Sequence, residues 1–211
     1  MNPAFDNLNE EKKNKIINAC LEEFAENGYE KASTNTMVVK AGISKGLLFH
    51  YFENKKNIYL YLVDYSMKHF LDRFYDNDFK ASSDLFERIM YRGIIKMKIA
   101  GEQPLMYKLV MEAFVDTPDG MKEEMNIRYK KMYEEHMPVV FEDIDYSLFR
   151  EDIDKQKAIE FMLLCFDSIY NKYMKMVKGK AIGLGLEEID KIVGEYYVFI
   201  DMIKYGIYRK S

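Results

Sequence analysis

Apolar residues recur every three or four positions along most of the chain, which is the spacing that places them on one face of an α-helix. Only 11 Gly and 4 Pro punctuate the 211 residues, so the helices should be long. Because no segment alternates apolar and polar residues for long enough to require a strand, we expect an all-α fold. Residues 137–149, MPVVFEDIDYSLF, fit either a loop or a broken helix. The pattern predicts helices over residues 10–27, 34–40, 45–52, 55–74, 83–100, 104–115, 118–137, 155–178 and 186–208.

The second and third predicted helices are short and are joined by about three residues that include Gly42. Glycine readily takes the left-handed conformation that often ends a helix, and Ser44 is a good N-cap for the helix that follows. This spacing predicts a helix-turn-helix, in which the second helix enters the DNA major groove. The inward positions of both helices carry apolar side chains that would pack them together, namely Met37, Val38, Ala41, Ile43, Leu48 and Tyr51.

Lysines occupy the first turns of two predicted helices, at Lys45 and at the pair Lys55–Lys56. A helix N-terminus carries a partial positive charge, so each lysine there costs about 0.3–1 kcal/mol unless an anion compensates it. Although the net charge is -4, no acidic residue occurs between Lys31 and Phe52, and this local charge favours a DNA phosphate. Ordinary solvated lysines are the alternative for each position taken alone. The expected DNA-contacting residues are Thr34, Thr36, Ser44, Lys45, Gly46, Leu47, Phe49, His50, Tyr51 and Lys55.

The last two predicted helices, 155–178 and 186–208, are apolar around nearly their whole circumference. Such a helix must bury more than one face. One face can pack on the core of its own chain, and the other then pairs most simply with the same helices of a second copy across a two-fold axis. A central core position for one of these helices is the alternative. The expected homodimer interface consists of Phe161, Cys165, Tyr196, Phe199, Ile200 and Ile203.

The run from Thr34 through AGISKGLLFHYFENKKNIYLYL resembles the N-terminal signature of the tetracycline-repressor (TetR) family of bacterial transcriptional regulators. The sequence departs from that signature at Phe49, where the family usually has a tyrosine whose hydroxyl meets a phosphate. It also departs at Val38, where the family usually has alanine. The residues that match the signature are Thr34, Ala41, Gly42, Ile43, Ser44, Gly46, Phe52 and Lys55.

The resemblance implies a homodimeric repressor, or less often an activator, that binds a palindromic double-stranded DNA operator. Residues 1–57 would form the helix-turn-helix DNA-binding domain, and residues 58–211 a helical ligand-binding and dimerisation domain reached through a long helix. The two half-sites would lie one or more helical turns apart, each turn about 34–36 Å. A small effector would change the separation of the two DNA-binding domains and thereby release the operator.

The chain contains 15 Met, 14 Phe and 17 Tyr, most of them after Asn57. These side chains suit an adaptable apolar pocket, and equally the core of any helical domain, so both interpretations stay open for each residue. A pocket of this composition favours a small hydrophobic or aromatic effector. The candidate ligand-binding residues are Phe70, Met90, Met97, Leu109, Phe114, Tyr133, Phe166 and Tyr170.

Other classes of protein are less well supported. His136 lies among carboxylates, but no histidine follows at helical spacing and no phosphate-binding loop or nucleophile motif occurs, so we expect no enzyme, cofactor or metal site. Cys20 and Cys165 fall in apolar helical patterns and should be buried thiols. Without a signal peptide or membrane-spanning run, a cytoplasmic protein is expected. The alternative function is a DNA-binding protein without an effector, whose C-terminal domain binds a protein partner.

Overall fold

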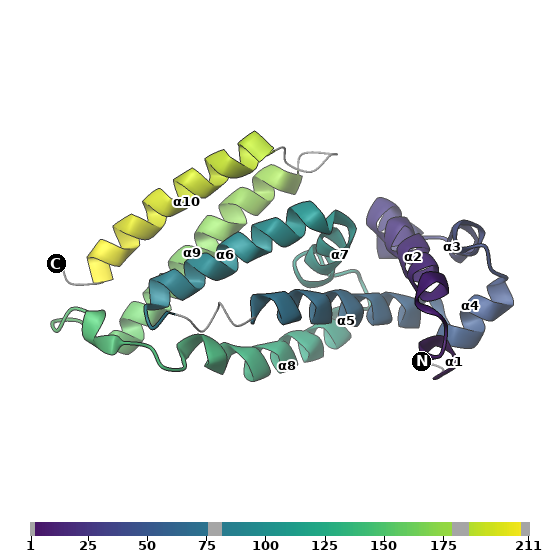
Figure 1. Ribbon diagram of the computed structural model, residues 1–211, viewed down its shortest axis with the longest axis horizontal. Helices are drawn as coiled ribbons and strands as arrows, with labels where there is room; N and C mark the ends of the chain where they lie inside the picture. Colours follow the sequence, from purple (N-terminus) through teal and green to yellow (C-terminus); the bar gives the residue numbers. More distant parts are fainter. Residues whose placement is uncertain (1–2, 76–81, 179–185, 208–211) are drawn as a thin grey trace. The chain divides into compact units, whose positions relative to one another are not determined.

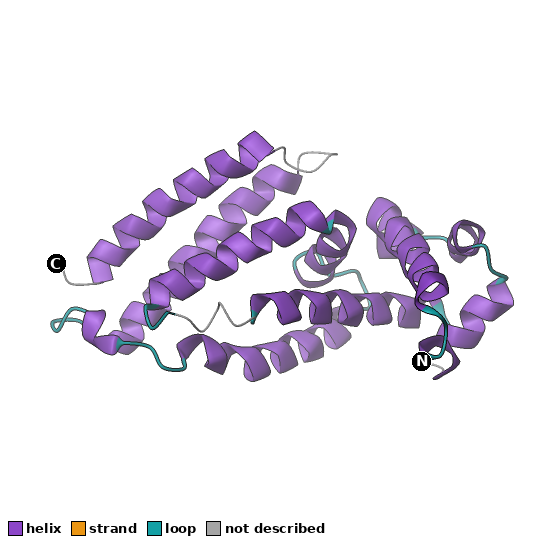
Figure 2. Ribbon diagram, viewed as in Figure 1, coloured by secondary structure: helices purple, strands orange, loops and turns teal. Residues whose placement is uncertain are grey.

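The computed structural model describes residues 3–75, 82–178 and 186–207, and within them the chain is helical, with no strand (Figure 2). The predicted all-α fold is therefore confirmed. The helices are α1 (Pro3–Asp6), α2 (Glu10–Lys31), α3 (Thr34–Ala41), α4 (Lys45–Phe52), α5 (Lys55–Phe74), α6 (Leu85–Glu102), α7 (Pro104–Phe114), α8 (Lys122–Phe141), the short 3-10 helix η2 (Tyr146–Leu148), α9 (Lys155–Lys178) and α10 (Leu186–Ile207).

Helix starts are the part of the fold that the sequence predicts best, because the capping side chain lies next to the helix it begins. Asn9 accepts a hydrogen bond from the backbone N–H of Lys12 at 2.9 Å, and Ser44 accepts one from Leu47 at 3.2 Å. Ser33, Asn54 and Asp154 cap α3, α5 and α9 in the same way.

Helix α2 is interrupted where the sequence predicts its end, at Asn27–Gly28. Gly28 has a φ of 68° and a ψ of 172°, which are not helical, before the element ends at Lys31. Only glycine takes this backbone conformation without strain. The chain therefore kinks at Gly28 and resumes a last helical turn, closed by a hydrogen bond from the N–H of Ala32 to the carbonyl of Gly28.

Helix α8 is displaced along the chain from its predicted range of 118–137. Pro118 lies in a turn, closed by the N–H of Met121, and Gly120 there has a φ of 79°. The helix begins only at Lys122 and runs past Pro138 to Phe141. The ambiguous segment 137–149 is thus the end of a helix followed by a loop with one 3-10 turn.

The contacts divide the chain into two compact units. Unit 1 comprises residues 1–73 and 102–135, and unit 2 comprises residues 74–101 and 136–211. The predicted functional division at residue 57 stays a prediction, since this division of contacts is of another kind. Each unit has its own apolar core.

The core of unit 1 joins the four N-terminal helices to α5 (Figure 1). Phe5 of α1 is fully buried, with its ring centroid 4.7 Å from that of Phe52 and 5.5 Å from that of Tyr61. Tyr59 of α5 lies between Phe24 and Tyr29 of α2, at 5.2 and 5.0 Å. Helix α7 also packs on α2. The helix-turn-helix is therefore held by α5 as well as by α2.

In unit 2, α6 packs against α9 and α10 (Figure 1). Phe166 of α9 lies between Phe86 of α6 and Tyr196 of α10, with ring centroids 6.2 and 6.1 Å away. The ring of Tyr196 on α10 packs against α6 at Gly93, where a Cβ atom would lie 3.2 Å from that ring. Burial raises the pKa of Tyr196 to about 12, against a smaller opposing effect of Arg92. Gly93 thus permits the close approach of α6 and α10.

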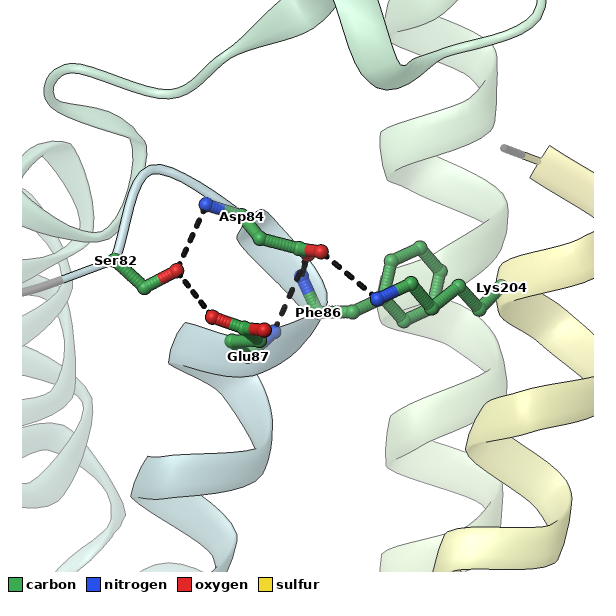
Figure 3. Close-up of polar contacts among 5 residues, drawn as sticks. All are labelled: Ser82, Asp84, Phe86, Glu87 and Lys204. Atoms are coloured by element: carbon green, nitrogen blue, oxygen red, sulfur yellow. Dashed lines mark hydrogen bonds and ion pairs between the residues drawn. The ribbon is translucent and has the colours of Figure 1, made fainter. Parts of the chain in front are cut away.

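The start of α6 is tied to α10 by Asp84 (Figure 3). One carboxylate oxygen of Asp84 accepts hydrogen bonds from the N–H groups of Phe86 and Glu87 at 2.8 and 3.4 Å. The other accepts from Lys204 of α10 at 2.8 Å, while Ser82 bridges to Glu87 (Figure 3). The helix predicted over residues 83–100 therefore begins after Asp84, because the carboxylate of Asp84 accepts hydrogen bonds from both the helix N-terminus and Lys204.

The end of α8 is tied to α6 by Arg88, which is only 3% exposed. Its guanidinium donates to the carbonyls of Val139 and Val140 at 3.4 and 3.3 Å, and also to that of Glu142. Its Nε donates to the carbonyl of Ser82. The carbonyls of Val139, Val140 and Glu142 lie at the C-terminal end of α8, where carbonyls have no partner within the helix itself. Arg88 therefore serves as the C-cap of α8.

Replacing Arg88 by methionine should destabilise the protein by about 3 kcal/mol, because the buried carbonyl of Val140 and the part-buried carbonyls beside it lose their donor, at about 1–3 kcal/mol for a fully buried group. Urea unfolding followed by circular dichroism measures the change. The matched control is Lys98→Met on the exposed face of the same helix, which should stay within about 0.5 kcal/mol of the wild type. Equal stability of the two variants would show that the capping contacts contribute nothing.

Candidate nucleic-acid interface

The turn between α3 and α4 has the geometry that the sequence predicts. Gly42 is left-handed, with φ of 66° and ψ of 36°, and its N–H donates to the carbonyl of Val39 at 3.2 Å. The N–H of Ile43 donates to the carbonyl of Val38 at 3.1 Å, which closes the end of α3. Ser44 then caps α4. The two helices are thus set at a fixed angle by three consecutive residues.

The outward face of α4 carries most of the predicted DNA-contacting residues. Lys45, Gly46 and His50 are exposed, and Leu47 and Phe49 are partly exposed. The ammonium of Lys45 lies 5.8 Å from the centroid of the Phe49 ring. A Cβ atom at Gly46 would meet nothing within 4 Å, so the fold itself does not require glycine there. A ligand that approaches the backbone closely would require it.

Tyr51 does not share this exposure. It is 5% exposed, and its ring packs edge-on against Phe5 at 5.4 Å. The sequence places Tyr51 both among the inward positions of the two helices and among the DNA-contacting residues, and its burial favours the first. We leave Tyr51 out of the proposed interface.

Polar residues at the start of α3 complete the predicted set. Thr34 and Thr36 are both partly exposed in its first turn. The N–H of Thr36 is already taken by the cap, Ser33, at 3.5 Å. Both threonine hydroxyls are therefore placed at a helix N-terminus, a position that suits contact with a phosphate.

The lysines at the start of α5 have partners within the protein. The Lys55 ammonium donates to the carbonyls of Glu30 and Ala32 at 3.1 and 3.3 Å, and lies 4.9 Å from the centroid of the Tyr29 ring. Lys56 forms an ion pair with Glu124 of α8, and its hydrogen bond holds the pKa of that carboxyl below the usual value. These contacts account for both lysines without a phosphate. Of the lysines predicted to sit at helix N-termini, only Lys45 therefore still favours contact with a DNA phosphate.

Lys40, the other lysine of the segment without acidic residues, is also paired. It lies 3.3 Å from a carboxylate oxygen of Glu22 and 3.4 Å from one of Glu26, both on α2. Carboxylates far away in the sequence thus reduce the positive charge of α3. The local basic character expected from the sequence is concentrated at the start of α4.

Residues 16–62 match the model of the family described as bacterial regulatory proteins, tetR family. The matched range begins within α2, contains the whole helix-turn-helix and ends within α5. The helix-turn-helix segment of the chain thus matches the TetR family. The description of that family names regulatory proteins, which agrees with the prediction of a regulator rather than an enzyme.

Solved structures show the same fold over nearly the whole chain. A TetR family transcriptional regulator from Chloroflexus aurantiacus J-10-FL superposes with a TM-score of 0.69 at 22% identity, covering 99% of each chain. The fatty acid degradation regulator FadR from Bacillus halodurans superposes with a TM-score of 0.65 at 16% identity, covering 92% of this chain and 98% of its own.

A curated relative matches over a shorter range. The fatty acid metabolism regulator protein of Bacillus subtilis (strain 168) is 32% identical over 74 residues, which cover 35% of this chain and 38% of that protein. The chain thus spans little more than a third of that relative's length in the match.

The predicted ligand-binding residues are divided between the two units. Phe70 and Leu109 are buried in unit 1, where Phe114 is partly buried and Tyr133 is exposed. Met90 and Phe166 belong to the core of unit 2. The side chains of Met97 and Tyr170 lie outside the described residues.

The predicted dimer residues of α9 and α10 fall into two groups. Phe161 is 55% exposed, and Cys165 and Phe199 are partly exposed along an open apolar groove of about 420 Å³ between the helices. Ile200 and Ile203, at 2% and 9% exposure, belong to the core of their own chain, and Tyr196 packs on Gly93. Other exposed apolar residues of these helices lie outside the predicted dimer set, namely Leu164, Tyr197, Val198, Met202 and Tyr205.

Two further findings bear on the other classes of protein. The His136 ring stacks on Tyr75 at 5.0 Å, and the Tyr75 hydroxyl donates to the His136 carbonyl at 3.3 Å, an arrangement typical of packing. Within the described ranges, no helix combines the length and hydropathy needed to cross a membrane.

Replacing Lys55 by methionine should destabilise the protein by about 1 kcal/mol in the absence of DNA, because the carbonyls of Glu30 and Ala32 lose a charged donor. Lys45→Met, which removes an exposed ammonium, should stay within about 0.5 kcal/mol of the wild type. Thermal unfolding of both variants without DNA tests this. If Lys55→Met is as stable as Lys45→Met, then Lys55 has no structural role.

Proposed function

We propose that this protein is a TetR-family DNA-binding transcriptional regulator that a small hydrophobic effector releases from a palindromic operator. The observation that carries the DNA-binding part is the outward face of α4, which presents Lys45, Gly46, Leu47, Phe49 and His50 on a helix capped at both ends. Exposed polar and apolar side chains on such a helix are the means by which a helix-turn-helix reads base edges.

Within this face, we assign two kinds of contact. Lys45 at the N-terminus of α4, with Thr34, Thr36 and Ser44, would hold phosphates and set the position of α4 in the groove. Leu47 and His50 lie one turn apart on the exposed side and would read bases. Phe49 lacks the hydroxyl for a phosphate contact and would supply apolar contact instead.

The operator would be palindromic because the protein would act as a homodimer. Phe161, Leu164 and Cys165 on α9 recur at helical spacing beside Phe199 and Met202 on α10, all along the apolar groove. Leu164 and Met202 are 62% and 67% exposed. Together with the other groove residues they form a continuous exposed apolar surface, here called the seam. A second copy of the same helix pair would cover this seam symmetrically.

The effector would be hydrophobic, with fatty acids and their derivatives as the first class to test. Two relatives support this choice by name, one a fatty acid metabolism regulator and the other a fatty acid degradation regulator. Release would follow if the effector binds the DNA-free conformation more tightly than the DNA-bound one.

Replacing Lys45 by alanine should weaken binding to operator and random duplexes by the same factor, roughly eightfold at 0.1 M salt, because one phosphate contact is lost. The slope of log affinity against log salt should fall by about 1. Fluorescence anisotropy over a salt series measures both, on an operator selected from genomic DNA. The control is Lys130→Ala, a lysine of α8 whose side chain is 75% exposed, which should change neither.

His50→Ala and Leu47→Ala should instead alter sequence preference, by roughly 5- to 150-fold at a single base pair. Binding of each variant to a set of single-base operator mutants measures this. A uniform loss on operator and random DNA for these variants would contradict the assignment of α4 as the reading helix.

Replacing Leu164 by glutamate should convert dimers into monomers, because the charge would be buried in the seam. Sedimentation velocity at micromolar concentration should report the mass of one chain. Leu164 is a better choice than Ile200, whose replacement would disturb the core of its own chain. Gln156→Glu, outside the seam on the same helix, adds the same charge and should stay dimeric. If Leu164→Glu also stays dimeric, the partner surface lies elsewhere.

A further inference from the structure

One face of α5 is buried along most of its length. Tyr59, Leu62, Val63, Ser66 and Phe70 recur at spacings of three and four residues, and each is 4% exposed or less. This spacing places all five on a single stripe of the helix. A stripe of this kind normally carries only apolar side chains, yet two of its members carry hydroxyl groups.

Both hydroxyls are buried and lack a hydrogen-bond partner among the described residues. A buried polar group without a partner lowers stability, so native structures contain few of them. A serine within a helix normally bonds back to a carbonyl of the preceding turn, and Ser66 does not. Each of the two hydroxyls therefore needs an explanation.

The surroundings of the two hydroxyls differ. Tyr59 faces α2, between Phe24 and Tyr29, and burial together with the Glu112 carboxylate raises its pKa above the usual value. Ser66 lies seven residues further along, about 10 Å along the helix axis. It is one turn before Phe70, whose ring lies 6.5 Å from that of Tyr107 on α7. Tyr59 thus belongs to the joint with the DNA-binding helices, and Ser66 to the region where α5 meets α7.

Unit 1 also buries several flexible side chains. It buries Met106, Met121 and Met125 in addition to Leu109, all on or beside α7 and α8. Methionine side chains are unbranched and can change rotamer at little cost, so a core that contains several of them can repack around a guest. An apolar ligand body could take the place of such side chains without exposing the core.

We propose that the Ser66 hydroxyl is the hydrogen-bond anchor for the polar group of the effector, whose apolar body runs along the α5 stripe toward Phe70. This inference rests on the effector-responsive function proposed above. It makes Ser66 a specificity-determining residue and the effector an amphiphile with an oxygen at one end of a hydrocarbon chain. A pure hydrocarbon would leave the hydroxyl unpaired.

The single hydroxyl also selects among oxygen groups. A hydroxyl can donate to a carbonyl oxygen, but one neutral donor does not offset the burial of a full negative charge. The site therefore favours a neutral acyl group, such as an ester or thioester, over a free carboxylate of the same chain length.

The test uses isothermal titration calorimetry on the full chain with methyl decanoate and decanoate, which differ only in the head group. The wild type should bind the ester more tightly than the acid. Ser66→Ala should weaken ester binding about fivefold, as expected for one neutral hydrogen bond, and Ser66→Thr should restore it.

Tyr59→Phe is the matched control, since it removes the second unpaired hydroxyl from the same stripe and should leave ester affinity unchanged. In thermal unfolding without ligand, neither Ser66→Ala nor Tyr59→Phe should lower the melting temperature, which separates a ligand role from a structural one. Equal ester affinity of the wild type and Ser66→Ala overturns the inference, while operator release by the ester would still support the proposed function. If neither probe binds or releases operator in the wild type, the acyl effector itself is refuted, and the inference with it.

Discussion

The attachment of α5 to α2 is the interaction on which the arrangement of unit 1 depends. The Lys55 ammonium closes the C-terminal carbonyls of α2, and four residues later Tyr59 inserts between Phe24 and Tyr29. Because α2 packs against α3 and α3 packs against α4, the side chains of α5 share one packed core with the helix-turn-helix. The contact of α7 with α2 adds a second attachment in the same unit, so α4 and the helices beside α5 belong to one compact unit.

The sequence predicts those features of the fold that are encoded locally. A capping side chain, a left-handed glycine and an apolar stripe act within four residues of each other, so Asn9, Ser44 and Gly42 could be assigned from their neighbours alone. The exposed face of α4 follows from the same periodicity. Lys55 shows the limit of this reasoning. Its position at a helix N-terminus indicates that the ammonium needs an acceptor, but the acceptors in the structure are two carbonyls 23 and 25 residues earlier in the chain.

Features that depend on distant segments were not predictable in this way. Nothing near Arg88 indicates that its guanidinium caps α8, although its place on the stripe of Leu85 and Ile95 marks it as a buried charge. In α9 and α10, apolar residues surround the helix, and periodicity cannot tell which face turns inward. Ile200 is therefore predicted for the dimer face although it is buried in the core of its own chain, and Leu164, which is not in the predicted set, is exposed.

In the proposed regulator, the unpaired hydroxyl of Ser66 on α5 would couple effector binding to DNA binding. Lys55 and Ser66 lie on one uninterrupted helix, about 16 Å apart along its axis. In the proposed regulator, a ligand that bonds to Ser66 would remove the cost of an unpaired polar group, and this gain would be available only in the conformation that admits the ligand. A core that is suboptimal without its ligand would thus supply the difference in affinity that regulation by an effector requires. Replacing Ser66 by a well-packed apolar residue would stabilise the fold and remove that difference, which gives a physical reason for a polar residue in the middle of an apolar stripe.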